Sequence, residues 1–203
     1  MGLGNPGSRY TGSPHNVGFR VVDHFAERHF GAGRAVWSQR FDAEFAMAPL
    51  ESEPLVLLKP LRFMNRSGES VRKAMTFFEL PTGAALIVHD ELDLPFGGVK
   101  LKLGGGEAGH NGLKSISAEL GTREYARLRV GVGRPVDGDV SDYLLSPLPS
   151  ARSSELESSL GEACAAIDLW VAHGIEAAMN RVNRKSALPA APAKSGSKAG
   201  QPD

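Results

Sequence analysis

Two glycine-rich segments of this sequence are each accompanied by a histidine that is followed directly by an asparagine. The first region is 2–7 (GLGNPG) with His15 and Asn16 after it, and the second is 104–112 (GGGEAGHNG). The acidic segment 89–93 (HDELD) lies between them along the chain. Imidazole exchanges a proton near neutral pH, and a side-chain amide offers two donors and an acceptor to a peptide backbone. These residue types indicate a site that moves a proton and holds a peptide-like substrate.

His15 is the candidate general base. Ser13 and Pro14 suit the N-cap and first position of a helix, which would place His15 in the first helical turn. The helix dipole disfavours the imidazolium form there and keeps the ring neutral. Asp90, expected directly after a buried strand that ends at Val88, is the candidate partner for the second ring nitrogen, because sites in α/β proteins assemble where strands end. The alternative is a surface or capping histidine.

Three asparagines are candidates for holding the substrate: Asn5, Asn65 and Asn111. Their amides match a peptide backbone and could also stabilise a developing oxyanion. The structural alternative is turn geometry, for which asparagine is common in glycine-rich turns. Asn65 could also cap the helix that follows it.

Other chemistries have less support in the sequence. Asp90 and Asp93 have no His-x-x-x-His or cysteine pair nearby, so we expect no metal and no cofactor. The turn 104–112 lacks the Gly-Lys-Ser/Thr ending of a triphosphate-binding loop. It could still bind an anion through its backbone, or be a plain connector. No Gly-x-Ser-x-Gly elbow occurs, and Cys164 fits core packing. If the chain is a hydrolase, water activated by histidine is the expected nucleophile.

The elements that must position these residues alternate between strands and helices, which predicts an α/β fold. Apolar runs at 55–58 and 85–88 predict buried strands. Strict alternation at 99–103 and 128–132 predicts half-exposed strands, with Lys100, Lys102 and Arg129 facing solvent. Apolar stripes with stop signals predict helices over about 13–31, 71–78, 113–120 and 150–182.

Bulk properties restrict the class of protein. The 203 residues fit one domain. Zero net charge argues against a protein that coats nucleic acid indiscriminately, although the basic stretches 59–73 and 97–134 could form a local phosphate-binding patch or merely solvated faces. No apolar run approaches the roughly 20 residues of a membrane span, and a single cysteine is compatible with the cytoplasm. We expect a domain over 1–185 and a disordered Ala/Pro/Gly/Ser/Lys tail over 186–203.

Taken together, the motifs resemble bacterial peptidyl-tRNA hydrolases over about residues 2–183. The resemblance rests on these segments in order: 5–7 (NPG), 15–18 (HNVG), 59–68 (KPLRFMNRSG), 89–93 (HDELD), 100–112 (KLKLGGGEAGHNG) and 127–133 (RLRVGVG). It implies an α/β/α sandwich around a mixed, twisted sheet, usually monomeric and without a metal. It also implies hydrolysis of the ester that joins a nascent peptide to tRNA.

The resemblance also implies roles for individual residues. His15 would be the base and Asp90 its orienting carboxylate. The peptide end would be bound by Asn5, Tyr10, Met64, Asn65, His110 and Asn111, and tRNA phosphates would contact Lys102 and Arg129. The rival hypothesis is a catalytically silent RNA-binding relative of the splicing-cofactor type. Retention of the histidine, the aspartate and the three asparagines argues against it, because binding alone does not require them.

The sequence departs from the family at its beginning. The family has an apolar strand before the GLGNPG turn, whereas only Met1 precedes Gly2 here. We therefore expect that the first strand is truncated and that the natural start lies upstream. A chain without that strand should expose backbone groups of the neighbouring strands and loosen Asn5.

Overall fold

Six strands form two three-stranded sheets in the computed structural model, which describes residues 1–31, 33–48 and 54–185. In one sheet β2 (Ala43–Ala48) pairs in antiparallel fashion with both β1 (Ser38–Arg40) and β3 (Leu55–Pro60). In the other, the central strand β6 (Ala126–Gly131) is parallel to β4 (Leu86–Glu91) and antiparallel to β5 (Val99–Leu103). The fold is therefore α/β, with one antiparallel sheet and one mixed sheet. The predicted tail lies outside the described residues.

The first residues of the chain lie between β3 and β4 and connect the two sheets by hydrogen bonds. Gly2 donates its backbone N–H to Leu58 O at 2.9 Å, and Leu3 donates to Val88 O at 2.9 Å. Val88 in turn donates to Met1 O at 2.8 Å. This short segment thus satisfies backbone groups that the sequence argument expected to be exposed.

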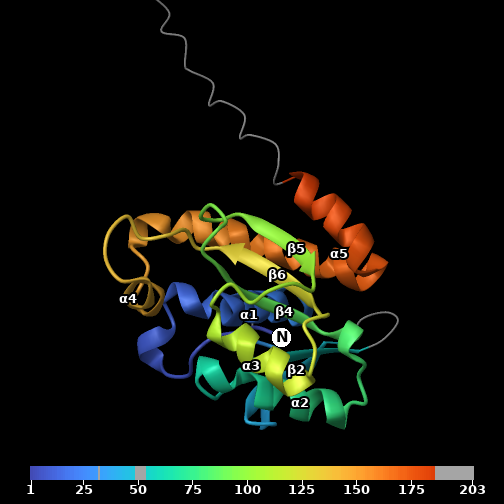
Figure 1. Ribbon diagram of the computed structural model, residues 1–203. Coiled ribbons are helices and arrows are strands. Elements are labelled where there is room, and N and C mark those ends of the chain that lie inside the picture. Colours follow the sequence, from blue (N-terminus) through green and yellow to red (C-terminus); the bar gives the residue numbers. More distant parts are fainter. Residues whose placement is uncertain (32, 49–53, 186–203) are drawn as a thin grey trace, which may run out of the picture.

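Five α-helices in the described residues pack on both faces of these strands. Helices α1 (Val17–Phe30) and α5 (Ser153–Lys185) share one apolar core with Leu86 and Val88, while α2 (Ser67–Phe77) and α3 (Asn111–Leu120) share a second core with Ile87. Alternate residues of β4 therefore serve opposite cores, as the pleat requires. Figure 1 shows α5 over β5 and β6, with α2 and α3 on the far side of β4. The fifth helix, α4 (Val140–Leu145), is short.

The outer edge of β5 is covered by a side chain from α5. Asn183 accepts from the backbone N–H of Leu101 and donates to its carbonyl oxygen, both at 2.9 Å. An unpaired strand edge can recruit another chain, and this amide satisfies both groups at the middle of the strand. Helix α5 is interrupted at Gly174, whose φ is 75°, and Asn183 lies in the part of the helix after this interruption.

Several predicted elements have different limits from those expected. The strand predicted over 85–88 runs to Glu91, so Asp90 lies within β4 and not after it. The β1–β2 hairpin and α4 were not predicted, because β1 is exposed along its whole length and α4 spans less than two turns.

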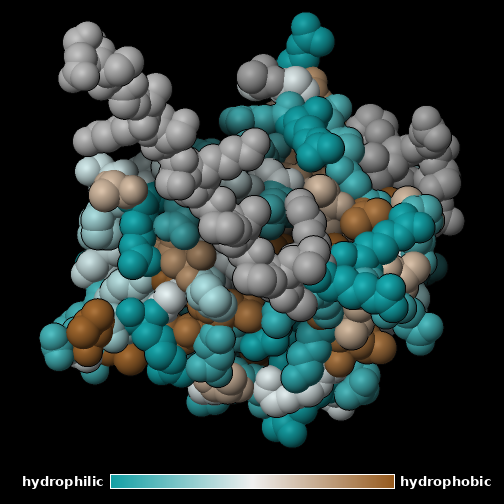
Figure 2. Space-filling model, turned by 90° about the horizontal axis from the view of Figure 1, so that it is seen from above, coloured by the Kyte–Doolittle hydropathy of each residue, from teal (hydrophilic) through white to brown (hydrophobic). Residues whose placement is uncertain are grey.

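Helices α1 and α3 end at their predicted stop signals, whereas the helix predicted over 150–182 begins at Ser153 and is interrupted at Gly174. Gly31 and Gly121 both have positive φ and directly follow α1 and α3. None of the described helices combines the length and apolar character needed to cross a bilayer. In Figure 2, outside the grey atoms, hydrophobic residues are dispersed among hydrophilic ones on the side facing the viewer.

Candidate active site

A cleft of about 640 Å³ opens beside the end of β4, the beginning of α3 and helix α4. All ten site residues proposed from the sequence line it: Asn5, Tyr10, His15, Met64, Asn65, Asp90, Lys102, His110, Asn111 and Arg129. They come from segments more than 120 residues apart along the chain. Tertiary folding therefore brings the sequence motifs together in one cavity.

His15 and Asp90 form a direct hydrogen bond. The distance from His15 Nδ1 to Asp90 Oδ1 is 2.7 Å. Since a carboxylate can only accept, Nδ1 carries the proton and Nε2 is left as the basic nitrogen. His15 lies in the 3-10 turn Pro14–Asn16 and not in the first turn of α1. Ser13 does not cap this turn, because its hydroxyl donates to Tyr10 O.

Asp90 is buried and forms a hydrogen bond with a second histidine. His110 Nε2 lies 3.1 Å from the same oxygen, Oδ1, that binds His15. Burial alone would raise the pKa of Asp90, but the interactions with His110 and His15 outweigh it and hold the pKa below its usual range. Asp90 is thus an ionised acceptor shared by two imidazoles.

His110 has a fixed tautomer because its other nitrogen caps α3. Its Nδ1 accepts from the backbone N–H groups of Gly112 and Leu113, at 3.1 and 3.4 Å. An acceptor carries no proton, so the proton lies on Nε2 and is donated to Asp90.

His15, Asp90 and His110 place one ligand atom each within 4.8 Å of one another, as a metal site could. A metal bound to His110 Nε2 would require the ring proton to move to Nδ1. There it would face the N–H groups and the positive dipole of the helix N-terminus, so this donor set does not fit a metal.

His89 completes a cluster of three histidines around Asp90. It is buried, its Nδ1 donates to the Asp90 carbonyl oxygen at 2.8 Å, and its Nε2 has no partner in the described residues. Burial lowers the pKa of His89 to about 3. The ring is therefore neutral and packs against His110 at a centroid distance of 5.1 Å.

Asn5 is fixed by two neighbours, contrary to the expectation that it would be loose. The side chain of Asn16 accepts from the Asn5 backbone N–H and donates to its carbonyl oxygen, both at 2.9 Å. The Met64 backbone N–H donates to Asn5 Oδ1 at 2.9 Å. With Oδ1 engaged, Nδ2 of Asn5 is the donor that remains for a ligand in the cleft.

The other two asparagines are exposed at the cleft. Asn65 lies in the 3-10 turn Met64–Arg66, and no side-chain cap precedes α2, so Asn65 does not cap that helix. Asn111 is the first residue of α3. Neither side chain has a hydrogen-bond partner among the described residues, which leaves both amides available to a ligand.

Basic residues occupy one face of the β5–β6 pair. Lys102 lies opposite Arg127, and Lys100 lies opposite Arg129. Lys102 is exposed, as predicted, but Arg129 is half-buried and donates to Glu91 at 2.8 Å. Arg127 is buried and donates to the carbonyl oxygens of Gly105 and Gly106, both at 2.6 Å. It therefore holds the glycine turn that leads to His110.

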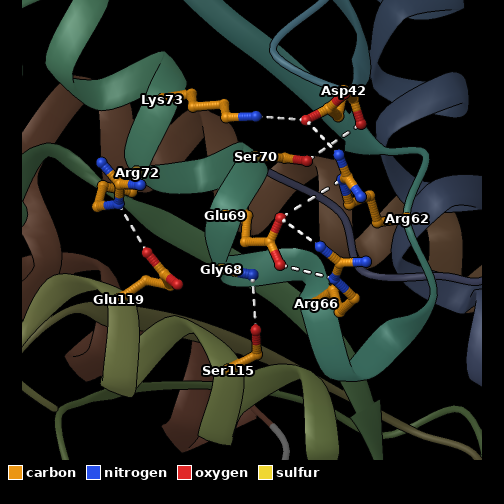
Figure 3. A network of polar contacts seen from close by, with 10 residues as sticks. All are labelled: Asp42, Arg62, Arg66, Gly68, Glu69, Ser70, Arg72, Lys73, Ser115 and Glu119. Atoms are coloured by element: carbon orange, nitrogen blue, oxygen red, sulfur yellow. Dashed lines mark hydrogen bonds and ion pairs between the residues drawn. The ribbon is translucent and has the colours of Figure 1, made fainter.

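The basic stretch 59–73 is neutralised by tertiary ion pairs. Arg62 and Lys73 both contact Asp42, and Arg66 contacts Glu69 (Figure 3). The other two basic residues, Lys59 and Arg72, also have carboxylate partners: Asp23 and Glu44, and Glu119, respectively. By contrast, Lys100, Lys102 and Lys114 have no ion pair within the described part of the chain. Of the two basic stretches, only the second retains free ammonium groups.

Comparison with known proteins agrees with this geometry. The family model described as peptidyl-tRNA hydrolase matches residues 1–190. The chain belongs to the peptidyl-tRNA hydrolase family. It is 47% identical over 181 residues to the peptidyl-tRNA hydrolase of Frankia casuarinae, covering 89% of this chain and 90% of that one. It is 44% identical over 184 residues to the Nocardia farcinica protein of the same name, covering 90% and 94%.

A solved structure shows the same fold. The crystal structure of peptidyl-tRNA hydrolase from Acinetobacter baumannii superimposes with a TM-score of 0.82 at 36% identity. The match covers 90% of this chain and 92% of that one. The chain is therefore an enzyme that hydrolyses peptidyl-tRNA, a function in translation.

Sequence reasoning did not assign roles to three residues that support the cleft: Asn16, His89 and Arg127. Asn16 follows His15 directly, and its clamp on Asn5 could not be foreseen from spacing. Arg127 precedes Arg129 by two residues, so strand alternation could have placed both on one face. His89 was included in the acidic segment without a role of its own.

Proposed function

We propose that His15 is the general base of the hydrolysis and that Asp90 orients it. The observation that carries this proposal is the 2.7 Å hydrogen bond from His15 Nδ1 to Asp90 Oδ1 at the wall of the cleft. It leaves Nε2 as the only ring nitrogen able to accept a proton. Asp90 also stabilises the imidazolium that forms when Nε2 takes that proton.

In the proposed reaction, His15 Nε2 removes a proton from water as the water oxygen attacks the ester carbonyl carbon. The tetrahedral intermediate then breaks its bond to the ribose oxygen. The His15 imidazolium returns the proton to that oxygen, so tRNA leaves with a free hydroxyl and the peptide leaves as its acid. No metal or cofactor is needed for this proton balance.

The peptide end would be bound by Asn5, Asn65 and Asn111, with Tyr10, Met64 and His110 lining the same cleft. Asn5 is the strongest donor candidate because Met64 fixes its oxygen and leaves Nδ2 for a carbonyl oxygen or a developing oxyanion. Lys102 and Arg129 would contact tRNA phosphates, and Lys102 is free of ion pairs among the described residues. In this proposal, tRNA would lie over the β5–β6 face.

Single-turnover deacylation of an N-blocked aminoacyl-tRNA tests the catalytic assignment. We expect His15→Ala to lower the rate by about 10²- to 10⁴-fold, the usual contribution of a general base. Binding of deacylated tRNA, measured by fluorescence anisotropy, should persist. A variant that cleaves at the wild-type rate would remove His15 from the mechanism.

We further propose that residues 1–185 form a single domain in which β1–β6 and the segment 1–3 act as one mixed, twisted sheet between two helical layers. The hydrogen bonds of Gly2 and Leu3 to both sheets support this arrangement. We also propose a monomer that acts in the cytoplasm, where its substrate is produced.

A further inference from the structure

We propose that His110 is a positioning residue for the reaction: it holds Asp90 through Nε2 while its Nδ1 caps helix α3. This inference rests on the proposed role of His15 as the base. It assigns His110 a different task from contact with the peptide. The observations that carry it are the two bonds to the ring nitrogens and the sharing of one carboxylate oxygen.

The cap determines which nitrogen of His110 bears the proton. Gly112 and Leu113 both direct backbone N–H groups at Nδ1. A proton on Nδ1 would face these donors and the positive end of the helix dipole. This arrangement favours the tautomer with the proton on Nε2, from which His110 donates to Asp90.

Packing keeps the His110 ring in this orientation. The ring is half-buried between His15 and His89, with centroid distances of 5.0 and 5.1 Å. A rotated ring would give up the helix cap and the bond to Asp90 together. The start of α3 and the catalytic carboxylate are thus mechanically linked through one side chain.

Because both histidines donate to the same oxygen, His110 affects how strongly Asp90 stabilises a protonated His15. Asp90 Oδ1 accepts from His15 at 2.7 Å and from His110 at 3.1 Å. Donation from His110 withdraws part of the negative charge that would otherwise stabilise the His15 imidazolium. The other charged and titratable side chains that line this cleft come from several elements and loops: Tyr10, His89, Glu91, Asp93, Lys102, Glu107, Arg127, Arg129 and Arg134. Loss of the His110 hydrogen bond should therefore strengthen the attraction of Asp90 for a protonated His15.

Two substitutions separate the two bonds of His110. In His110→Asn the side-chain oxygen can take the place of Nδ1 and keep the cap, but the amide is too short to reach Asp90. In His110→Gln the longer side chain can place its N–H₂ near the position of Nε2 and restore donation to Asp90. His173→Asn is the matched control, because His173 is exposed on α5 and does not line the cleft.

The measurement is the pH dependence of kcat/KM for deacylation, together with kcat and KM for each variant. We expect His110→Asn to lower kcat and to move the acid-side midpoint upward by about 0.5–1 pH unit. His110→Gln should return the midpoint towards that of the wild type. The thermal unfolding midpoint of each variant shows whether the fold is retained.

Other outcomes would overturn the inference. An asparagine variant with raised KM and an unmoved midpoint would make His110 a peptide contact only. If the acid-side midpoint moves equally in His110→Asn and His110→Gln, the hydrogen bond from His110 to Asp90 is not the cause of the shift. If His15→Ala retains activity, the assignment of His15 as the base is rejected. If His15→Ala is inactive but the His110 variants do not behave as expected, only the His110 inference is rejected.

Discussion

At the scale of single residues, the site is built from polar groups that are fixed by other polar groups. Asn16 holds the backbone of Asn5, and the Met64 backbone fixes its amide. His110 and His15 both form hydrogen bonds to Asp90 Oδ1. Such second contacts restrict each functional side chain to one orientation before the substrate arrives, which lowers the entropy lost on reaction.

The buried neutral His89 predicts an acid-sensitive fold. Its pKa is about 3 in the folded state and about 6.5 when exposed on unfolding. Between these values the unfolded chain binds the extra proton, so stability falls as the pH falls. We expect His89→Asn, which cannot titrate, to reduce this slope by up to about 1.4 kcal/mol per pH unit.

Urea unfolding of the His89 variant at several pH values from 4 to 6.5 measures this slope. The absolute stability of the variant also changes because a buried side chain shrinks, so only the dependence on pH is diagnostic. His173→Asn, an exposed histidine on α5, should keep the wild-type slope. Parallel curves for His89→Asn and the wild type would contradict the prediction.

At the scale of elements, close backbone approaches position the helices that carry the site. Gly68 in α2 lies against α3, where an added Cβ would be 2.2 Å from the Ser115 carbonyl oxygen. Its backbone N–H also donates to the Ser115 hydroxyl at 3.0 Å. Helix α3 begins at Asn111 and α2 follows Asn65, so the spacing of these helices affects both asparagines.

Gly68→Ala should therefore separate α2 from α3. We expect a loss of about 1–3 kcal/mol in the free energy of unfolding, the usual cost of overpacking a well-packed contact. Gly161→Ala in α5 is the control, because no atom lies within 4 Å of its added Cβ. It should raise stability by roughly 0.4–1 kcal/mol. Chemical denaturation of both variants tests the contrast, and equal effects would show that the α2–α3 contact can relax.

At the scale of the whole molecule, zero net charge conceals an uneven distribution. The basic residues of 59–73 are paired with carboxylates, whereas Lys100, Lys102 and Lys114 are unpaired in the described regions. A protein of this kind can bind tRNA at one face without a general affinity for nucleic acid. It can also release the product, since few phosphates are neutralised.

The salt dependence of tRNA binding tests this distribution. We expect Lys102→Ala to reduce the slope of log K against log salt by about 1, as loss of one phosphate contact does. Lys73→Ala should leave the slope unchanged, because Lys73 is already paired with Asp42 (Figure 3). Anisotropy titrations from 50 to about 200 mM salt measure both. A reduced slope in the Lys73 variant would place tRNA on the α2 side as well.

The sequence by itself determined the elements with strong periodicity and predicted residues that line one cleft. The apolar runs and stop signals at Gly31 and Gly121 predicted helices and strands, because local burial patterns and backbone conformation depend on near neighbours. The motifs also identified the ten residues that share the cleft. His15, Asp90 and the three asparagines stand out by their residue types in short segments, whereas the other five were predicted from the resemblance to the family.

Only the tertiary structure decided which of these groups touch and in which state. Nothing in the spacing of His15, Asp90 and His110 indicates that two imidazoles share one oxygen, or that a helix cap fixes a tautomer. Charge pairing likewise depends on neighbours far apart in sequence, such as Lys73 with Asp42 and Arg129 with Glu91. Hydrogen bonds and ion pairs act over a few ångströms. They are therefore set by the packing of distant segments, which no single segment encodes.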